Sequence, residues 1–274
     1  MTLHGTSRAS LEAARQTMEP MVHAIGDDAM SVGQQLFAVV DALDSSAGLR
    51  RILADPSLPA EEKQAVASRL LSASAADAKV IYTVNTVVAS RWSADSDLPD
   101  ALEALATDAI LINAESRGAL GQVEDETFAI IRGLRGQRQA RETLSDPRSN
   151  PAMRAAIVDK LLDGQVDAAT LTLARRATTA LRGKRFIANL LALGETIAAR
   201  RSTTIAQVIS AVALNDAQKS RLQDLLSRAY NTAVQVYVTI DPSIVGGLRI
   251  QVGADVVDTT VLTRLADARR QVAA

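Results

Sequence analysis

The sequence has no cysteine and few aromatic or histidine residues, and each scarcity excludes a class of protein. Without cysteine, the 274-residue chain has no disulfide bond and no thiolate for catalysis or zinc binding. His4 and His23 are the only histidines, which argues against a structural zinc site. Aromatic residues make up 3% of the chain, so the cores must consist of Leu, Ile, Val and Ala, which suits closely packed helices.

Motifs for catalysis are also missing from the sequence. No stretch has the spacing of a phosphate-binding P-loop, and residues 182–185 lack both the loop length and the hydroxyl. The acidic pairs Asp27–Asp28 and Glu61–Glu62 are adjacent in the chain, so their side chains diverge. Their positions at predicted helix starts are explained by the helix dipole. We therefore expect no catalytic residue, no cofactor and no metal.

Long apolar runs are absent too. The longest are short and interrupted by charge, so the sequence predicts no segment that spans a bilayer. Residues 1–8 do not have the apolar core of a signal peptide. We expect a cytoplasmic chain that reaches a membrane only through a partner.

The helical part of the sequence repeats at an offset of 91 residues. Phe37 recurs as Phe128 and Leu53 as Leu144, and one register holds for more than fifty residues, which indicates a tandem duplication. A further helix, over residues 7–22, precedes the first copy. Each copy is predicted to contain five helices, at 28–43, 47–54, 60–72, 75–91 and 97–115, and at 119–135, 138–145, 151–163, 166–182 and 185–201.

The second copy has no counterpart of the helix at 7–22. We hypothesise that the helix from Leu98 to about Asn113 closes the first bundle and also substitutes for the missing helix of the second. Its apolar positions Leu98, Leu102, Leu105 and Ile112 would serve both bundles.

The two copies carry opposite net charge. Residues 25–115 contain 6 basic and 14 acidic side chains, net −8, whereas residues 116–202 contain 15 basic and 9 acidic side chains, net +6. The charges would form solvated faces, bind different partners, or attract the two copies to one another. Nucleic-acid binding is the weaker interpretation, because the whole chain is near neutral and no aromatic residues alternate with the basic ones. The basic clusters in the second copy are Arg132, Arg135, Arg138 and Arg141, and Arg175, Arg176, Arg182, Lys184 and Arg185.

After residue 202 the pattern changes to short strands. Residues 203–214 are rich in β-branched side chains and predict a strand, and Asn215 with Gln218 predicts a capping box at the start of a helix. Strict alternation predicts strands at 234–240 and 248–252, followed by a short segment at 256–257 and a closing helix capped by Asp258. The fold class is therefore mainly α, with tandem helical bundles at 1–115 and 116–202 and a small α+β domain at 203–274.

The segment from residue 234 to 253 carries a family signature. It combines aliphatic residues at alternating positions, a polar residue, a glycine pair, and a second alternating stretch that ends in glycine. In this pattern it resembles the C-terminal signature of the delta subunit of bacterial F-type ATP synthase, the counterpart of the oligomycin-sensitivity-conferring protein. The matching residues are Val234, Val236, Ile240, Asp241, Ile244, Gly246, Gly247, Leu248, Ile250, Gln251 and Gly253.

The resemblance implies a structural, non-catalytic subunit of the peripheral stalk, at the cytoplasmic face of the cell membrane and in one copy per enzyme. The helical part would bind the N-terminal helices of the alpha subunits, and the C-terminal domain would bind the b-type stalk helices. Membrane contact would come only through partners, and no nucleic acid would be bound. The chain is one helical bundle longer than ordinary members of the family. The alternative is a helical adaptor or a nucleic-acid-binding repeat protein.

Overall fold

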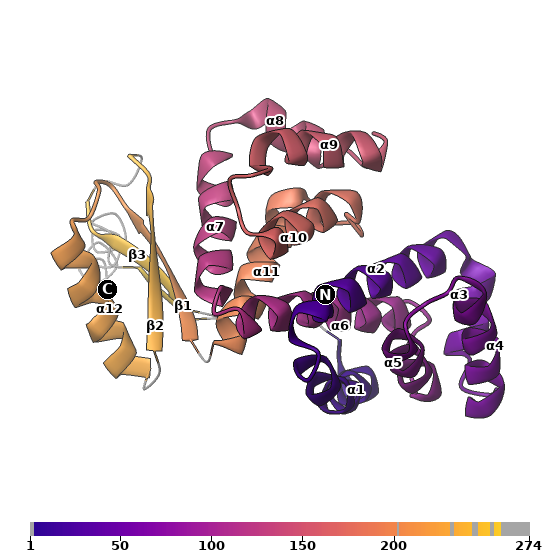
Figure 1. Cartoon of the computed structure of the whole chain (residues 1–274). Coiled ribbons are helices and arrows are strands. Elements are labelled where there is room, and N and C mark those ends of the chain that lie inside the picture. The colour runs from indigo at the N-terminus through magenta and orange to yellow at the C-terminus, as the bar shows by residue number, and fades with distance from the viewer. Residues whose placement is uncertain (1–2, 202, 231–232, 243–245, 253–254, 259–274) are drawn as a thin grey trace, which may run out of the picture. The chain divides into compact units, whose positions relative to one another are not determined.

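The computed structural model describes residues 3–201, 203–230, 233–242, 246–252 and 255–258, and it confirms a mainly α-helical chain with helical bundles (Figure 1). The chain forms two compact units, Met1–Leu190 and Leu191–Ala274. Helix α11 (Phe186–Arg200) contributes residues to both of them. The sequence-based boundaries after residues 115 and 202 stay a prediction.

The first unit is built from the two helical copies. The first copy follows α1 (Gly5–His23) and the short 3-10 helix η1 (Gly26–Asp28), and the second copy ends with α11. Helices of the first copy are α2 (Ala29–Ser45), α3 (Ala47–Ala54), α4 (Ala60–Ala73), α5 (Ala78–Ala89) and α6 (Asp97–Ser116). Those of the second are α7 (Leu120–Gly133), α8 (Arg138–Leu144), α9 (Pro151–Leu162), α10 (Ala168–Thr179) and α11.

The same local contacts start equivalent helices in the two copies. Asp77 caps α5 and Asp167 caps α10, because each side chain accepts a hydrogen bond from the backbone N–H two residues on, at 2.7 and 2.8 Å. The backbone N–H of each aspartate in turn donates to a side chain 42 or 41 residues earlier, Gln35 in α2 and Glu126 in α7, at 2.9 Å in both cases. Gln35 and Glu126 are themselves 91 residues apart, so the duplication includes this contact.

Helix α6 is shared between the two copies, as the sequence analysis hypothesised. It packs against α1 and the first-copy helices α2, α3 and α5, and also against the second-copy helices α7 and α10. Most residues from Leu98 to Ala114 are buried, including the polar Asp108 and Asn113. Such extensive burial is expected for a helix that packs against two bundles.

Helices α2 and α6 approach one another closely at Gly33. A Cβ atom at this position would lie 2.6 Å from Cδ1 of Ile110 and 2.8 Å from the carbonyl oxygen of Ala106. No larger residue fits there without a shift of the helices. The first bundle therefore depends on a glycine in the middle of a helix.

The second unit contains a four-stranded sheet and a helix. The strands have the order β2-β1-β3-β4; β1 pairs with β2 in parallel and with β3 antiparallel, and β3 pairs with β4 antiparallel. The elements are β1 (Thr203–Ser210), α12 (Asp216–Tyr230), β2 (Ala233–Ile240), β3 (Leu248–Val252) and β4 (Asp255–Asp258). The predicted capping box is present, because Asn215 and Gln218 exchange two hydrogen bonds between side chain and backbone, at 2.8 and 2.9 Å.

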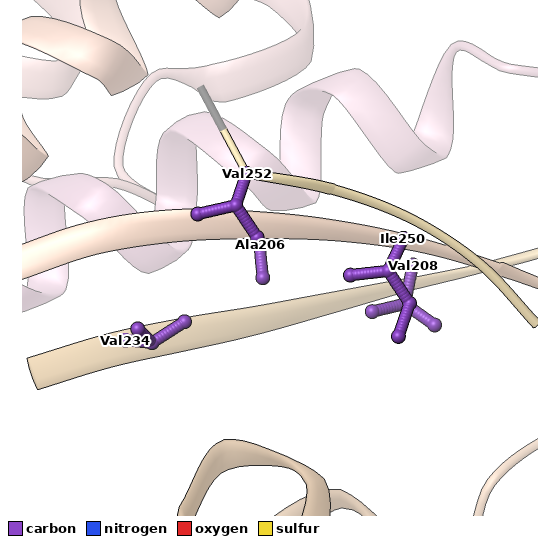
Figure 2. Packing of buried hydrophobic residues seen from close by; sticks show 5 residues of the cluster. All are labelled: Ala206, Val208, Val234, Ile250 and Val252. Carbon is purple, nitrogen blue, oxygen red and sulfur yellow. The ribbon is translucent and has the colours of Figure 1, made fainter. Parts of the chain in front are cut away.

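One face of this sheet carries the core of the second unit. Figure 2 shows the five buried side chains, which come from β1, β2 and β3 and gather on the same face: Ala206, Val208, Val234, Ile250 and Val252. Helix α12 packs against this cluster through Leu222, Leu226 and Tyr230. The two-residue period of the strands places alternate side chains on the core face.

Two details of the predicted C-terminal part differ from the structure or lie outside it. The first strand ends at Ser210 rather than Leu214, and Val212, predicted to be on its apolar face, is 68% exposed. The short segment at 256–257 is confirmed as part of β4, and Asp258 is the last residue of that strand. The predicted closing helix lies outside the described residues.

Candidate functional site

The family signature forms part of the sheet in the second unit. Val234 in β2 and Ile250 in β3 are buried in the core, and Val236 and Leu248 pack partly buried against it. Ile240, at the end of β2, is 48% exposed. Gln251 is exposed on β3, while Ile244 and Gly253 lie outside the described residues. Most of the described aliphatic positions of the signature therefore build the domain itself.

The remaining signature residues shape the connection between β2 and β3. Gly246 and Gly247 have φ angles of +75° and +86°, a left-handed conformation that other residues adopt only with strain. The backbone N–H of Asp241 donates to the carbonyl oxygen of Ser210 at 2.8 Å, which fixes the end of β2 beside the end of β1. The glycine pair thus has a structural reason.

A second cluster joins the two helical copies around Arg176 of α10, which is 8% exposed. Its Nε donates to Glu103 of α6 at 2.9 Å, and its Nη2 donates to the other oxygen of that carboxylate at 2.5 Å. Its Nη1 donates to Asp41 of α2 at 2.7 Å, and its Cζ lies 4.6 Å from the centroid of the Phe37 ring. Burial alone would lower the pKa of Arg176, but Glu103 and Asp41 outweigh that effect and raise this pKa above its usual value.

Arg182, which follows α10, makes the same kind of contact six residues further along the chain. It donates to Asp44 of α2 at 2.5 Å and also to Asp100 of α6. Its φ angle is +47°, which is uncommon for a residue other than glycine. Four acidic residues of the first copy thus contact two arginines of the second. Some of the opposite charges of the two copies therefore form ion pairs that hold the copies together.

A third ion pair links the end of α6 to the start of α10. Arg117, the residue after α6, donates from Nη1 and Nη2 to the two carboxylate oxygens of Asp167 at 2.8 and 2.9 Å. These hydrogen bonds lower the pKa of Asp167 more than burial raises it, and the backbone N–H of Ala169 lowers it further. The pair adds to the contact of the shared helix with the second copy.

Sequence reasoning did not identify a buried cation that recurs in both copies. Lys63 in α4 and Arg154 in α9 are 91 residues apart, and both are buried. Arg154 donates to four backbone carbonyls, those of Asp146, Ser149, Thr178 and Thr179, at 2.6 to 3.3 Å. Burial lowers the pKa of Lys63. Their shared position in the repeat was the signal that could have revealed them.

Several of the other predicted basic residues of the second copy lie at its surface. Arg132, Arg135, Arg138 and Arg185 are exposed, and of these Arg138 forms an ion pair, with Glu142 at 2.8 Å. Arg175 pairs with Asp159 inside the second copy. The predicted basic cluster at 175–185 is therefore not a single surface patch, because Arg176 and Arg182 form ion pairs with acidic residues of the first copy.

The described residues contain neither a metal-binding group nor a membrane-spanning helix. In the described part of the chain, no group of three or more His, Asp and Glu side chains could hold a metal ion. Within the same residues no helix combines the length and apolar character needed to cross a bilayer. His4 and His23 are both exposed. Trp92 is buried and donates its indole N–H to the carbonyl oxygen of Val87 at 2.9 Å, so it is a core residue.

Comparison with known proteins identifies the family. The model of the family described as ATP synthase delta (OSCP) subunit matches residues 106–272. The chain is 48% identical to the ATP synthase subunit delta of Beutenbergia cavernae over 99% of its own length and 100% of the relative. It is 42% identical to that of Kineococcus radiotolerans, over 98% and 97% of the two chains, and 37% identical to that of Streptomyces avermitilis over the full length of both. Among solved structures, a chain of the mitochondrial ATP synthase hexamer of Toxoplasma gondii aligns with a TM-score of 0.40 and 16% identity, over 61% of this chain and 95% of that one.

The chain therefore belongs to the ATP synthase delta (OSCP) subunit family. It is a structural, non-catalytic subunit of ATP synthase with a role in the peripheral stalk. The full-length relatives share its enlarged size. The family model begins within α6 and extends through the second copy into the C-terminal unit.

Proposed function

We propose that this subunit connects the alpha/beta catalytic hexamer to the b-type stalk helices and resists the torque of the rotor during proton-driven ATP synthesis. The observation that carries the proposal is that one chain of this family consists of two separate compact units. A connection between two partners needs two binding surfaces in series, and both must hold under load. The helical unit offers one, and the small α+β unit offers the other.

The proposed partner of the helical unit is the set of N-terminal alpha-subunit helices. An amphipathic helix binds by laying its apolar side into a groove between other helices. Large apolar side chains are exposed on helices of both copies, at Ile52, Val66, Leu70, Tyr82, Met153 and Leu161. Such side chains supply the kind of surface that helix binding uses.

The proposed partner of the α+β unit is the distal end of the b-type helices. The family signature lies in this unit and fixes the sheet, and Ile240 leaves an apolar side chain at its surface. In this arrangement the subunit lies at the cytoplasmic face of the cell membrane, in one copy per enzyme, and reaches the membrane only through its partners.

A single substitution in the second unit separates the two contacts. Val234→Asp places a carboxylate in the sheet core, where burial of an unpaired charge is strongly unfavourable. We expect the full-length variant to lose binding to a soluble b-type stalk fragment and to keep binding to the catalytic hexamer, measured by pull-down with each partner. Ile240→Val is the conservative control. Equal loss of both partners, or of neither, would contradict the assignment of one partner to each unit.

A further inference from the structure

The interface between the two helical copies supplies an internal template for an unassigned surface. In the first copy, Asp41 and Asp44 at the end of α2 receive Arg176 and Arg182 of the second copy. This is a head-to-tail contact between repeats, in which each copy presents a different surface to its neighbour. Such a contact leaves the equivalent surface of the last copy without a following repeat to fill it.

The equivalent surface of the second copy has the opposite charge. At the offset of 91 residues, Arg132 takes the place of Asp41 and Arg135 takes the place of Asp44. The register is secure at this point, because Leu43 and its counterpart Leu134 are both buried. Arg132 and Arg135 are exposed, and neither forms an ion pair with another described residue.

Further positive charge lies close to these two residues along the chain. Arg138 and Arg141 follow on α8, and Arg185 acts on the same carboxylate as they do, since all three lower the pKa of Glu142, Arg138 most strongly. Glu142 carries a single negative charge, whereas the three arginines that act on it carry three positive charges. The surface therefore keeps an excess of positive charge that the described residues do not neutralise.

We propose that Arg132 and Arg135 are the centre of a docking surface on the second copy, and that its occupant is an acidic helical segment of another subunit of the ATP synthase. The template indicates a protein occupant, because the equivalent surface of the first copy is filled by the end of helix α10 and the residues that follow it. Charge complementarity indicates its acidic character. The inference rests on the proposed function and deepens it, because it adds a polar contact to the helix-binding surface.

The variant that tests the surface is Arg132→Asp with Arg135→Asp in the full chain. It places the first copy's own residues at the equivalent positions of the second, so the helix is expected to fold as α2 does. The control is Arg8→Asp with Arg91→Asp, which changes the net charge equally at two exposed positions, on α1 and just after α5, that are not next in sequence to the apolar side chains of the proposed helix-binding surface. Circular dichroism and thermal unfolding of both variants verify that they are folded.

The probes are the catalytic hexamer stripped of this subunit, the soluble b-type stalk fragment and a short DNA duplex, each titrated at about 50 and about 200 mM salt. We expect the variant to bind one of the two protein probes about 10- to 100-fold more weakly at the lower salt concentration, with a reduced salt dependence, while the control binds as the wild type does.

Three results would overturn the inference. Unchanged affinity and salt dependence for both protein probes would show that the surface is only solvated. Binding of the DNA by the wild type, lost in the variant, would assign the surface to nucleic acid. If the wild type bound neither protein probe, the proposed function itself would fail and the inference with it.

Discussion

At the scale of single residues, Arg176 shows what the charge of the two copies does. The net charges of −8 and +6 were visible in the sequence, and attraction between the copies was one of the interpretations. The pairing itself was not predictable, because Arg176 and Asp41 are 135 residues apart and the repeat offers no equivalent pair. The position equivalent to Arg176 in the first copy is Asn85, so periodicity gave no signal.

Replacing Arg176 by alanine should lower the free energy of unfolding by about 1.5–3 kcal/mol, because Glu103 and the largely exposed Asp41 lose charge-assisted hydrogen bonds to a buried partner. Urea unfolding at neutral pH measures the change. The control is the neighbouring residue: Arg175 pairs with Asp159 at a partly exposed site, and its replacement by alanine should cost only about 0–1 kcal/mol. Equal losses in the two variants would show that Arg176 does not join the copies in the way described.

The ionisation of Asp167 should make the free energy of unfolding decrease at acidic pH. Its pKa is lowered in the folded state, chiefly by Arg117, so its contribution is present above the ordinary aspartate pKa of about 3.9 and is lost as the pH falls through the folded value. Asp167→Asn keeps a capping side chain and removes the charge. We expect this variant to be less stable than the wild type at neutral pH, with a difference that shrinks in acid, measured by urea unfolding across the pH range. A constant difference would contradict the role of the ion pair.

At the scale of elements, most helix limits followed from the sequence. Predicted and observed limits in the two copies differ by no more than three residues, and Pro151 gave a clear local start signal for α9. The predicted starts of α5 and α10 were three and two residues early, because the prediction did not use Asp77 and Asp167 as capping residues. The predicted end of β1 at Leu214 was wrong. Apolar β-branched residues continue to Val212, but pairing with β2 and β3 stops at Ser210. Local propensity indicates where a strand is possible, and the neighbouring strands determine where it ends.

The contact of α2 with α6 at Gly33 was not predictable from local pattern, because it depends on a residue more than seventy positions away. Gly33→Ala should lower the free energy of unfolding by about 1–3 kcal/mol, because the new Cβ would meet Ile110 and the backbone of Ala106. Chemical denaturation provides the measurement.

The control for this substitution is Gly133→Ala at the end of α7, where a Cβ meets nothing within 4 Å. It should be neutral or stabilising by up to about 1 kcal/mol, because alanine is the better helix former. If Gly33→Ala behaved in the same way, the close approach of the two helices would be disproved.

At the scale of the whole molecule, the sequence identified the family and the duplication, and the structure added how the copies are joined. The shared helix α6 and the ion pairs of Arg117, Arg176 and Arg182 make one compact unit of two repeats. The sequence analysis hypothesised that the helix from Leu98 to about Asn113 serves both bundles, and α6 indeed packs against helices of both copies. The signals were its apolar positions and the missing counterpart of the first helix in the second copy.

The proposed role of the subunit is to bring two partners into one complex. The most direct test is sedimentation of the stripped catalytic hexamer with the soluble b-type fragment, in the absence and presence of the full chain. The account predicts that the b-type fragment sediments with the hexamer only when the chain is present, and that Val234→Asp abolishes this joint sedimentation while the variant itself still sediments with the hexamer. Sedimentation of the b-type fragment with the hexamer in the absence of the chain, or its failure to do so in the presence of the wild-type chain, would contradict it.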